Sequence, residues 1–155
     1  MSAPGVTTSA VEVLPHEFGA VLLEHVWIVD ARTTQASAVV RPGTPFGEQT
    51  DDWPAWLAIE MMAQTVAAGA GLREFRPGVR PTLGLLLGVR QFTCLLPVFS
   101  AGSILRLEAV ESTRDDNGLG VFDCTLDVDG QSGTRATLSV YLPPSINDYL
   151  REIGA

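Results

Sequence analysis

The chain has 155 residues, enough for one domain with a substantial core and too few for two. Hydrophobic residues make up 46% of it and charged residues 18%, and the net charge of −8 argues against a nucleic acid as partner. No apolar run is long enough to span a membrane, and the N-terminus has neither a basic start nor a signal core. We therefore expect a single cytoplasmic domain over residues 1–155, with residues 1–10 flexible.

The first elements expected in chain order are a β-hairpin and a long helix. Residues 21–30 and 33–40 alternate apolar and polar side chains around a turn, as hairpin strands do. Residues 41–52 are rich in Pro, Gly, Thr and acidic residues, which indicates a loop. An apolar helix follows from about Pro54 to about Leu72, because Pro suits a first turn, Ala, Leu, Met and Gln favour the interior, and two glycines near its end offer a stop.

The second half of the chain predicts strands. Residues 83–94 are mostly apolar, and residues 104–112, 119–128 and 134–142 are alternating strands joined by tight turns, which makes a meander. A short amphipathic helix is expected over 145–153. The order of a hairpin, one long apolar helix and a meander predicts an α+β domain whose antiparallel sheet wraps around a single central helix.

Glu60 is the only charged residue between Pro54 and Gly71, in a helix that is apolar on nearly every face. An ionised carboxylate is costly there unless it is paired or hydrogen-bonded. A carboxyl group in such surroundings is useful in proton transfer. The other interpretation is a structural acid at a subunit or layer boundary, satisfied by Gln64 one turn later. The residues alone leave both interpretations open.

Metal chemistry is not predicted. The two cysteines, Cys94 and Cys124, lie in apolar, strand-like stretches without CxxC spacing, so we expect buried thiols. The two histidines, His16 and His25, do not cluster with them. We therefore expect no zinc site and no cofactor.

All ten basic residues are arginines, and four of them lie close together in the chain. Guanidinium groups pair well with carboxylates and phosphates, so this stretch is a candidate docking surface for an acidic partner or a phosphate group. A solvated rim after the helix is the other interpretation. The four residues are Arg73, Arg76, Arg80 and Arg90.

Several spaced motifs resemble the FabZ/FabA-type 3-hydroxyacyl-acyl-carrier-protein dehydratases, whose fold is the hot-dog fold. Residues 14–26 resemble the family's N-terminal Leu-Pro-His motif. The sequence Pro-Ala-Trp-Leu-Ala-Ile-Glu at 54–60, followed by Ala-Gln, resembles the start of its central helix, and Gly88 matches the glycine of its third strand. Later matching positions are Pro97, Gly102, Gly130 and Ala136. The pairing of Pro-Ala-Trp with Ile-Glu-Met-Met-Ala-Gln is most similar to the ApeP-like branch.

The resemblance implies an enzyme that removes water from a 3-hydroxyacyl thioester in a fatty-acid-like or aryl-polyene-type pathway. Acyl carrier protein would be a partner, and the chain would form a homodimer or a heterodimer with another hot-dog protein. Glu60 takes the place of the family's helix acid, and Gln64 would orient the acid or a nearby backbone group. Ala55 takes the place of the glycine whose N–H, at the helix start, polarises the thioester carbonyl.

The resemblance also implies a role for residues around the acyl chain. The substrate-binding residues it suggests, besides Gln64, are Trp53, Trp56, Phe46 and Gly88. For the three aromatic residues, at the mouth of an acyl tunnel, core packing is the alternative. The four arginines would dock the carrier protein or its phosphopantetheine phosphate.

One position departs from the family pattern. The slot of the catalytic histidine, fourteen residues before the acid, holds Phe46, and residues 41–53 contain no histidine. Either His16 reaches the site, or Asp51 or Asp52 serves as the base, or a different hot-dog protein contributes a histidine in a heterodimer. The alternatives to a dehydratase are a catalytically incomplete acyl-binding or scaffolding subunit and a hot-dog thioesterase whose helix acid activates water.

Overall fold

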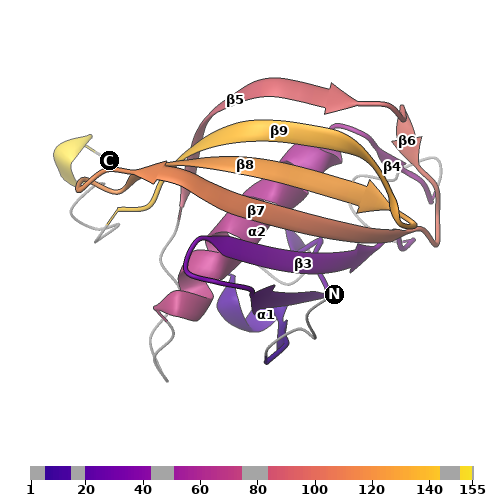
Figure 1. The fold of residues 1–155 in the computed structure, drawn as a ribbon, viewed down its shortest axis with the longest axis horizontal. Helices are drawn as coiled ribbons and strands as arrows, with labels where there is room; N and C mark the ends of the chain where they lie inside the picture. The colour runs from indigo at the N-terminus through magenta and orange to yellow at the C-terminus, as the bar shows by residue number, and fades with distance from the viewer. Residues whose placement is uncertain (1–5, 15–19, 43–50, 75–83, 144–150, 155) are drawn as a thin grey trace.

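The computed structural model of the protein describes residues 6–14, 20–42, 51–74, 84–143 and 151–154 (Figure 1). Four of the residues singled out in the sequence, His16, Phe46, Arg76 and Arg80, lie outside this part of the chain. So does most of the expected C-terminal helix. No helix in the described part is long and apolar enough to cross a membrane.

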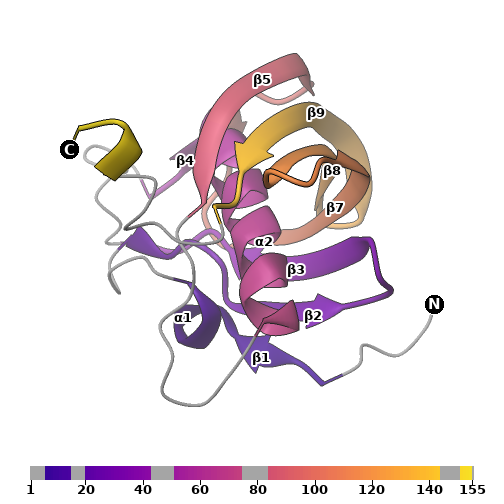
Figure 2. The ribbon, with the colours of Figure 1, turned by 90° about the vertical axis from the view of Figure 1, so that its left-hand side faces the viewer.

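A seven-stranded antiparallel sheet curls around one long helix (Figure 2), as the order of the expected elements predicts. The strand order is β1-β2-β3-β7-β8-β9-β5, and β4 and β6 form a separate two-stranded sheet. The strands are β1 (Thr8–Ser9), β2 (His25–Ile28), β3 (Thr33–Val39), β4 (Trp53–Pro54), β5 (Leu85–Cys94), β6 (Val98–Phe99), β7 (Ile104–Arg114), β8 (Leu119–Val128) and β9 (Gln131–Tyr141). The helices are α1 (Ala10–Val13) and α2 (Leu57–Arg73).

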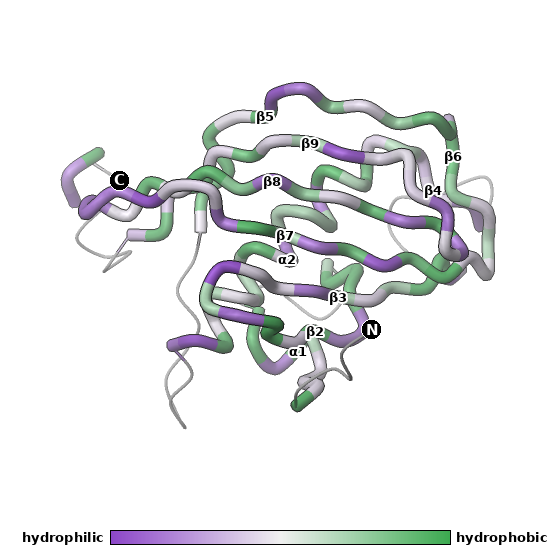
Figure 3. The backbone as a smooth tube through the Cα atoms, viewed as in Figure 1, coloured by the Kyte–Doolittle hydropathy of each residue, from purple (hydrophilic) through white to green (hydrophobic). Residues whose placement is uncertain are grey.

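The hairpin and the meander predicted from alternation are confirmed. β2 pairs with β3, and β7, β8 and β9 follow one another as antiparallel neighbours. Along β7, Leu105 and Leu107 are buried, whereas Ile104 and Arg106 are exposed, which is the expected separation of the two faces. The same alternation of apolar and polar residues is visible along β7 and β8 in Figure 3.

The helix begins three residues later than predicted, at Leu57 instead of Pro54. Trp53 and Pro54 instead pair with Phe99 and Val98 as the small β4–β6 sheet. Trp53 is fully buried, so its packing and this pairing hold the segment extended and override its local preference for a helix.

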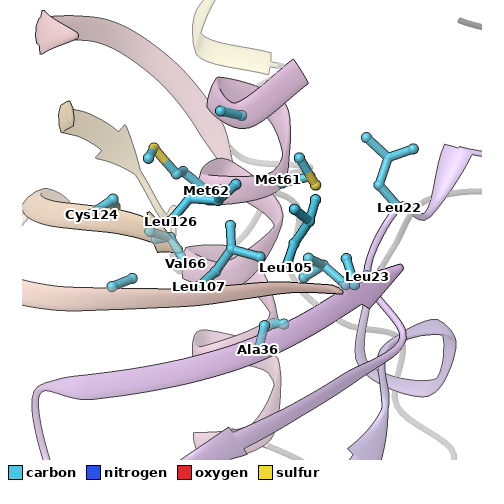
Figure 4. Close-up of a cluster of buried hydrophobic side chains, with 14 of the residues drawn as sticks. Leu22, Leu23, Ala36, Met61, Met62, Val66, Leu105, Leu107, Cys124 and Leu126 are labelled. Atoms are coloured by element: carbon cyan, nitrogen blue, oxygen red, sulfur yellow. The ribbon is translucent and has the colours of Figure 1, made fainter. Parts of the chain in front are cut away.

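The middle part of α2 packs against the concave face of the sheet. Met62 and Val66 lie beside Leu107 and Leu126 in the close-up of the core (Figure 4). The helix is buried on most of its sides, as its uniformly apolar sequence predicts.

The two glycines expected to end α2 lie inside it, and the helix continues to Arg73. A Cβ at Gly69 would collide with Thr34 Oγ1 on β3, and one at Gly71 would lie 2.5 Å from the carbonyl oxygen of Val13. These glycines therefore allow close approach of α2 to β3 and to α1.

β5 is the edge strand of the large sheet and differs from its neighbours in burial. None of its ten residues is fully buried, and Leu87 is 58% exposed. Its register with β9 shifts twice, and Gln91 has a φ of 55°, in the left-handed region. A Cβ at Gly88 would meet no atom within 4 Å in the described chain.

Candidate active site

Glu60 and Gln64 lie one turn apart on α2, so their side chains share a face of the helix. Gln64 Nε2 donates a hydrogen bond to Glu60 Oε1 at 3.0 Å. Gln64 is fully buried, whereas Glu60 is half-buried. The amide therefore fixes the orientation of a carboxylate that keeps one side accessible.

Gln64 also binds the backbone that precedes β2. Its Nε2 donates to the carbonyl oxygen of Ala20 at 2.8 Å, and its Oε1 accepts the N–H of Leu22 at 2.9 Å. Both N–H groups of the amide and its oxygen thus have partners, so this buried side chain has one orientation. It contacts the acid and a nearby backbone segment at the same time.

The carboxylate of Glu60 borders a cavity of about 200 Å³ between α2 and the edge of the sheet. Its walls are formed by both polar and apolar groups, and the cavity is partly open to solvent. Leu85 and Leu86, at the start of β5, form the wall on the side of the exposed edge strand. The full lining is Glu60, Ala63, Gln64, Ala67, Gly84, Leu85, Leu86 and Val140.

The two tryptophans expected at an acyl tunnel do not line this cavity. Trp53 is fully buried in the core, in agreement with the core-packing alternative, and its Nε1 has no hydrogen-bond partner among the described residues. Trp56, at the N-cap of α2, is 56% exposed. Neither tryptophan nor Gly88 borders the Glu60 cavity.

The N–H of Ala55, expected to face the thioester carbonyl, donates to the carbonyl oxygen of Pro97 at 3.1 Å. This bond extends the pairing of β4 with β6 by one residue. A thioester oxygen would therefore have to replace the Pro97 carbonyl before Ala55 could bind it. The sequence could not indicate this contact, because its two residues are far apart in the chain.

The candidates for a second proton-transfer group are not beside Glu60 in the described part. Asp52 Oδ1 accepts the N–H of Ala101 at 2.7 Å and so holds the turn before β7, and Asp51 is exposed. The histidine that the structure describes, His25, is exposed on β2 and pairs with residues of β1 and β3. No cluster of His, Cys, Asp and Glu among the described residues could hold a metal ion.

Arg73 is bound to the β2–β3 turn and to the start of β3. Its Nη1 donates to Thr34 Oγ1 at 2.9 Å, and its Nη2 donates to the carbonyl oxygens of Asp30 and Thr33 at 2.9 and 3.3 Å. Burial lowers the pKa of this guanidinium below its usual value. Of the four expected docking arginines, the structure describes Arg73 and Arg90, and both are exposed.

Sequence reasoning missed Arg41, which follows β3 and was placed in a loop. The guanidinium of Arg41 binds residues 21, 22 and 24, the same segment that Gln64 binds from the helix. The only local indication of a structural role for Arg41 is its position directly after the apolar end of a strand. Its partners come from a separate part of the chain, so its contacts could not be predicted.

Comparison with known proteins gives a family and a fold. A family model described as ApeP-like, ApeP dehydratase, matches residues 8–151. A chain of the dehydratase heterocomplex ApeI:P from Xenorhabdus doucetiae is 30% identical and superposes with a TM-score of 0.83, over 96% of this chain and 99% of that one. No curated protein shows a significant sequence match.

Two more distant structures share the fold alone. Cj0977, a sigma28-regulated virulence protein from Campylobacter jejuni, has a TM-score of 0.63 at 11% identity, with 91% of each chain covered. A hypothetical thioesterase from Streptococcus pneumoniae has a TM-score of 0.55 at 11% identity, over 76% of this chain and 88% of that one. The shared architecture is the hot-dog fold, as predicted.

Proposed function

Because the chain belongs to the ApeP-like dehydratase family, we propose that it acts in the removal of water from a 3-hydroxyacyl thioester, with Glu60 as the proton-transfer group of the central helix. The observation that carries this proposal is the Glu60 carboxylate itself. It is oriented by the fully buried Gln64 amide, and Glu60 borders a cavity whose walls include the apolar residues Leu85 and Leu86. A positioned carboxylate beside an apolar chain is suited to general acid–base catalysis.

The reaction needs two proton-transfer events. A base removes a proton from C2 of the acyl chain, the C3–O bond breaks, and the C2=C3 double bond forms. Glu60, in its protonated form, gives its proton to the departing hydroxyl, which leaves as water. The proton taken by the base restores Glu60 at the end of the cycle, so the products are a 2-enoyl thioester and one water molecule.

The base, in this proposal, comes from a second hot-dog protein that pairs along β5. The family's histidine slot holds Phe46, and β5 presents exposed apolar side chains, with Leu87 58% and Leu86 41% exposed. Among the described residues no strand pairs with the outer edge of β5, and a strand edge with such side chains favours addition of a strand from another chain. Leu86 also borders the Glu60 cavity, so a partner on this edge would lie next to the acid. The related chain from Xenorhabdus doucetiae belongs to a dehydratase heterocomplex.

The substrate, we further propose, arrives on acyl carrier protein in the cytoplasm, in a fatty-acid-like or aryl-polyene-type pathway. A thioester is the chemical form in which a carrier protein holds an acyl chain. Arg90 is exposed on the same strand as the proposed partner surface and could pair with a phosphate.

The test is to incubate the chain with a 3-hydroxyacyl carrier-protein thioester, alone and together with a histidine-containing hot-dog dehydratase. Mass spectrometry would follow the acyl group. We expect an enoyl product with the partner present, and its loss in Glu60→Gln. The matched control is Glu108→Gln, on β7, whose carboxylate binds Gln35 and does not border the cavity.

Three results would contradict the proposal in different ways. Release of the free acid would identify a thioesterase. Binding of the thioester without turnover would identify an acyl-binding or scaffolding subunit. Full activity of Glu60→Gln in the complex would exclude Glu60 from proton transfer and place the chemistry on the partner.

A further inference from the structure

We propose that Arg41 is a positioning residue for Glu60, because it holds residues 20–24, here named the 20–24 segment, against Gln64. This inference rests on the proposed role of Glu60. It adds a residue outside the cavity and outside the motifs that carry the family resemblance. The link runs from Arg41 through the backbone of Leu22 to Gln64 and from there to the carboxylate.

Arg41 binds the 20–24 segment at three points. Its Nη2 donates to the carbonyl oxygen of Val21 at 2.8 Å, and its Nη1 donates to the carbonyl oxygen of Leu22 at 3.3 Å and to Glu24 Oε1 at 2.9 Å. The planar fork of a guanidinium can bind several oxygens at fixed angles, which a lysine ammonium cannot. Arg41 thus fixes the position of the segment from its outer side.

Gln64 binds the same segment from the helix. The peptide groups of Leu22 connect the two side chains, since its N–H donates to Gln64 Oε1 and its carbonyl oxygen accepts from Arg41 Nη1. Two of the three hydrogen bonds of the Gln64 amide are made to the segment, and the third is made to Glu60. A shift of the segment would therefore free the amide to rotate and would weaken its hydrogen bond to the carboxylate.

Arg41 also contacts the residue that leads into α2. Its guanidinium carbon lies 5.8 Å from the ring centre of Trp53, within range of a cation–π interaction. Trp53 is fully buried in β4, four residues before the N-terminal Leu57 of α2. Arg41 thus joins the 20–24 segment to the start of the helix that carries Glu60.

The protein offers a matched control for this arrangement. Arg106, on β7, lies 5.0 Å from the ring centre of Trp27, so Arg106→Met also removes an arginine from a tryptophan ring. Arg106 makes no hydrogen bond to the 20–24 segment or to Gln64 among the described contacts. A second control, Glu24→Gln, weakens the ion pair of Arg41 and leaves the two carbonyl contacts in place.

The experiment measures kcat and KM of Arg41→Met, Arg41→Lys and the two controls in the full complex with the partner dehydratase. We expect Arg41→Met to lower kcat about 10- to 100-fold with KM unchanged, because misplacement of a catalytic group costs that much. Arg41→Lys should lie between wild type and Arg41→Met, since it keeps the charge and loses the fork. Both controls should retain wild-type kcat.

A second readout does not depend on activity. Hydrogen exchange of the Gln64 side-chain amide, measured by NMR and assigned with Gln64→Leu, should be slow in wild type, because both N–H groups are bonded and buried. It should be faster in Arg41→Met and Arg41→Lys and unchanged in Arg106→Met. If Arg41→Met does not fold, Arg41→Lys provides both readouts.

The two proposals fail in distinguishable ways. Absence of dehydration by the wild-type complex would contradict the proposed function, while Gln64 exchange would still test the link to Arg41. Unchanged Gln64 exchange in both Arg41 variants would overturn the positioning role. So would an equal loss of kcat in Arg106→Met, which would show a general effect of losing an arginine from a tryptophan ring.

Discussion

Gly69 of α2 lies so close to Thr34 of β3 that a Cβ at position 69 would collide with the threonine hydroxyl oxygen. The same hydroxyl accepts a hydrogen bond from Arg73, one turn further along α2. Helix and strand therefore meet through a glycine and a shared polar contact. The position of the helix over the sheet, and with it the position of Glu60, depends on this approach.

We expect Gly69→Ala to lower the free energy of unfolding. In an exposed helix the substitution would stabilise by about 1 kcal/mol, but overpacking of a core costs about 1–3 kcal/mol, and here the neighbour is a side chain held in place by Arg73. Urea unfolding followed by tryptophan fluorescence measures the change. Gly88→Ala is the control and should not destabilise the chain, because a Cβ there meets nothing within 4 Å. Equal stability of the two variants would contradict the close packing.

We expect Leu87→Lys to weaken binding of the partner hot-dog protein at least about tenfold, as loss of a buried apolar contact at an interface does. The substitution places a charge on the free edge of β5. Ile104→Lys is the matched control, since Leu87 and Ile104 are both 58% exposed and Ile104 lies on β7, away from that edge. Sedimentation velocity measures the dissociation constant of the complex. The same loss of affinity in both variants would show that β5 is not the contact surface.

We expect the two thiols to differ in reactivity near neutral pH. Burial raises the pKa of Cys124 to about 12, so almost none of it is thiolate until the pH approaches that value. Cys94 is half-buried, and its Sγ lies 3.1 Å from the carbonyl oxygen of Leu96. A thiol reagent should modify Cys94 in the folded chain and both cysteines in urea. Rapid labelling of folded Cys94→Ser would contradict this.

The parts of the fold that local pattern determines were predicted. The alternation of apolar and polar residues predicts the hairpin and the meander, and the uniformly apolar sequence of α2 predicts that the helix is buried. Glu60 and Gln64 could be paired in advance because residues four apart on a helix are neighbours.

The structure differs from expectation where contacts between residues far apart in the sequence determine the local structure. Pairing with Val98 and Phe99 delays the helix to Leu57, and the carbonyl of Pro97 takes the N–H of Ala55. The hydrogen bonds of Arg73 to the β2–β3 turn are likewise made to residues far away in the sequence. These contacts exist only once the chain has folded, so no local pattern could indicate them.

Two irregularities in β5 limit what can be added to this edge of the sheet. A long, straight apolar edge would accept strand after strand and lead to aggregation. The register of β5 shifts between Leu86 and Gly88 and again between Arg90 and Thr93, where the backbone of Gln91 is in the left-handed region, so a straight partner strand cannot follow β5 along its whole length. These irregularities thus favour one partner of matching shape over open-ended self-assembly.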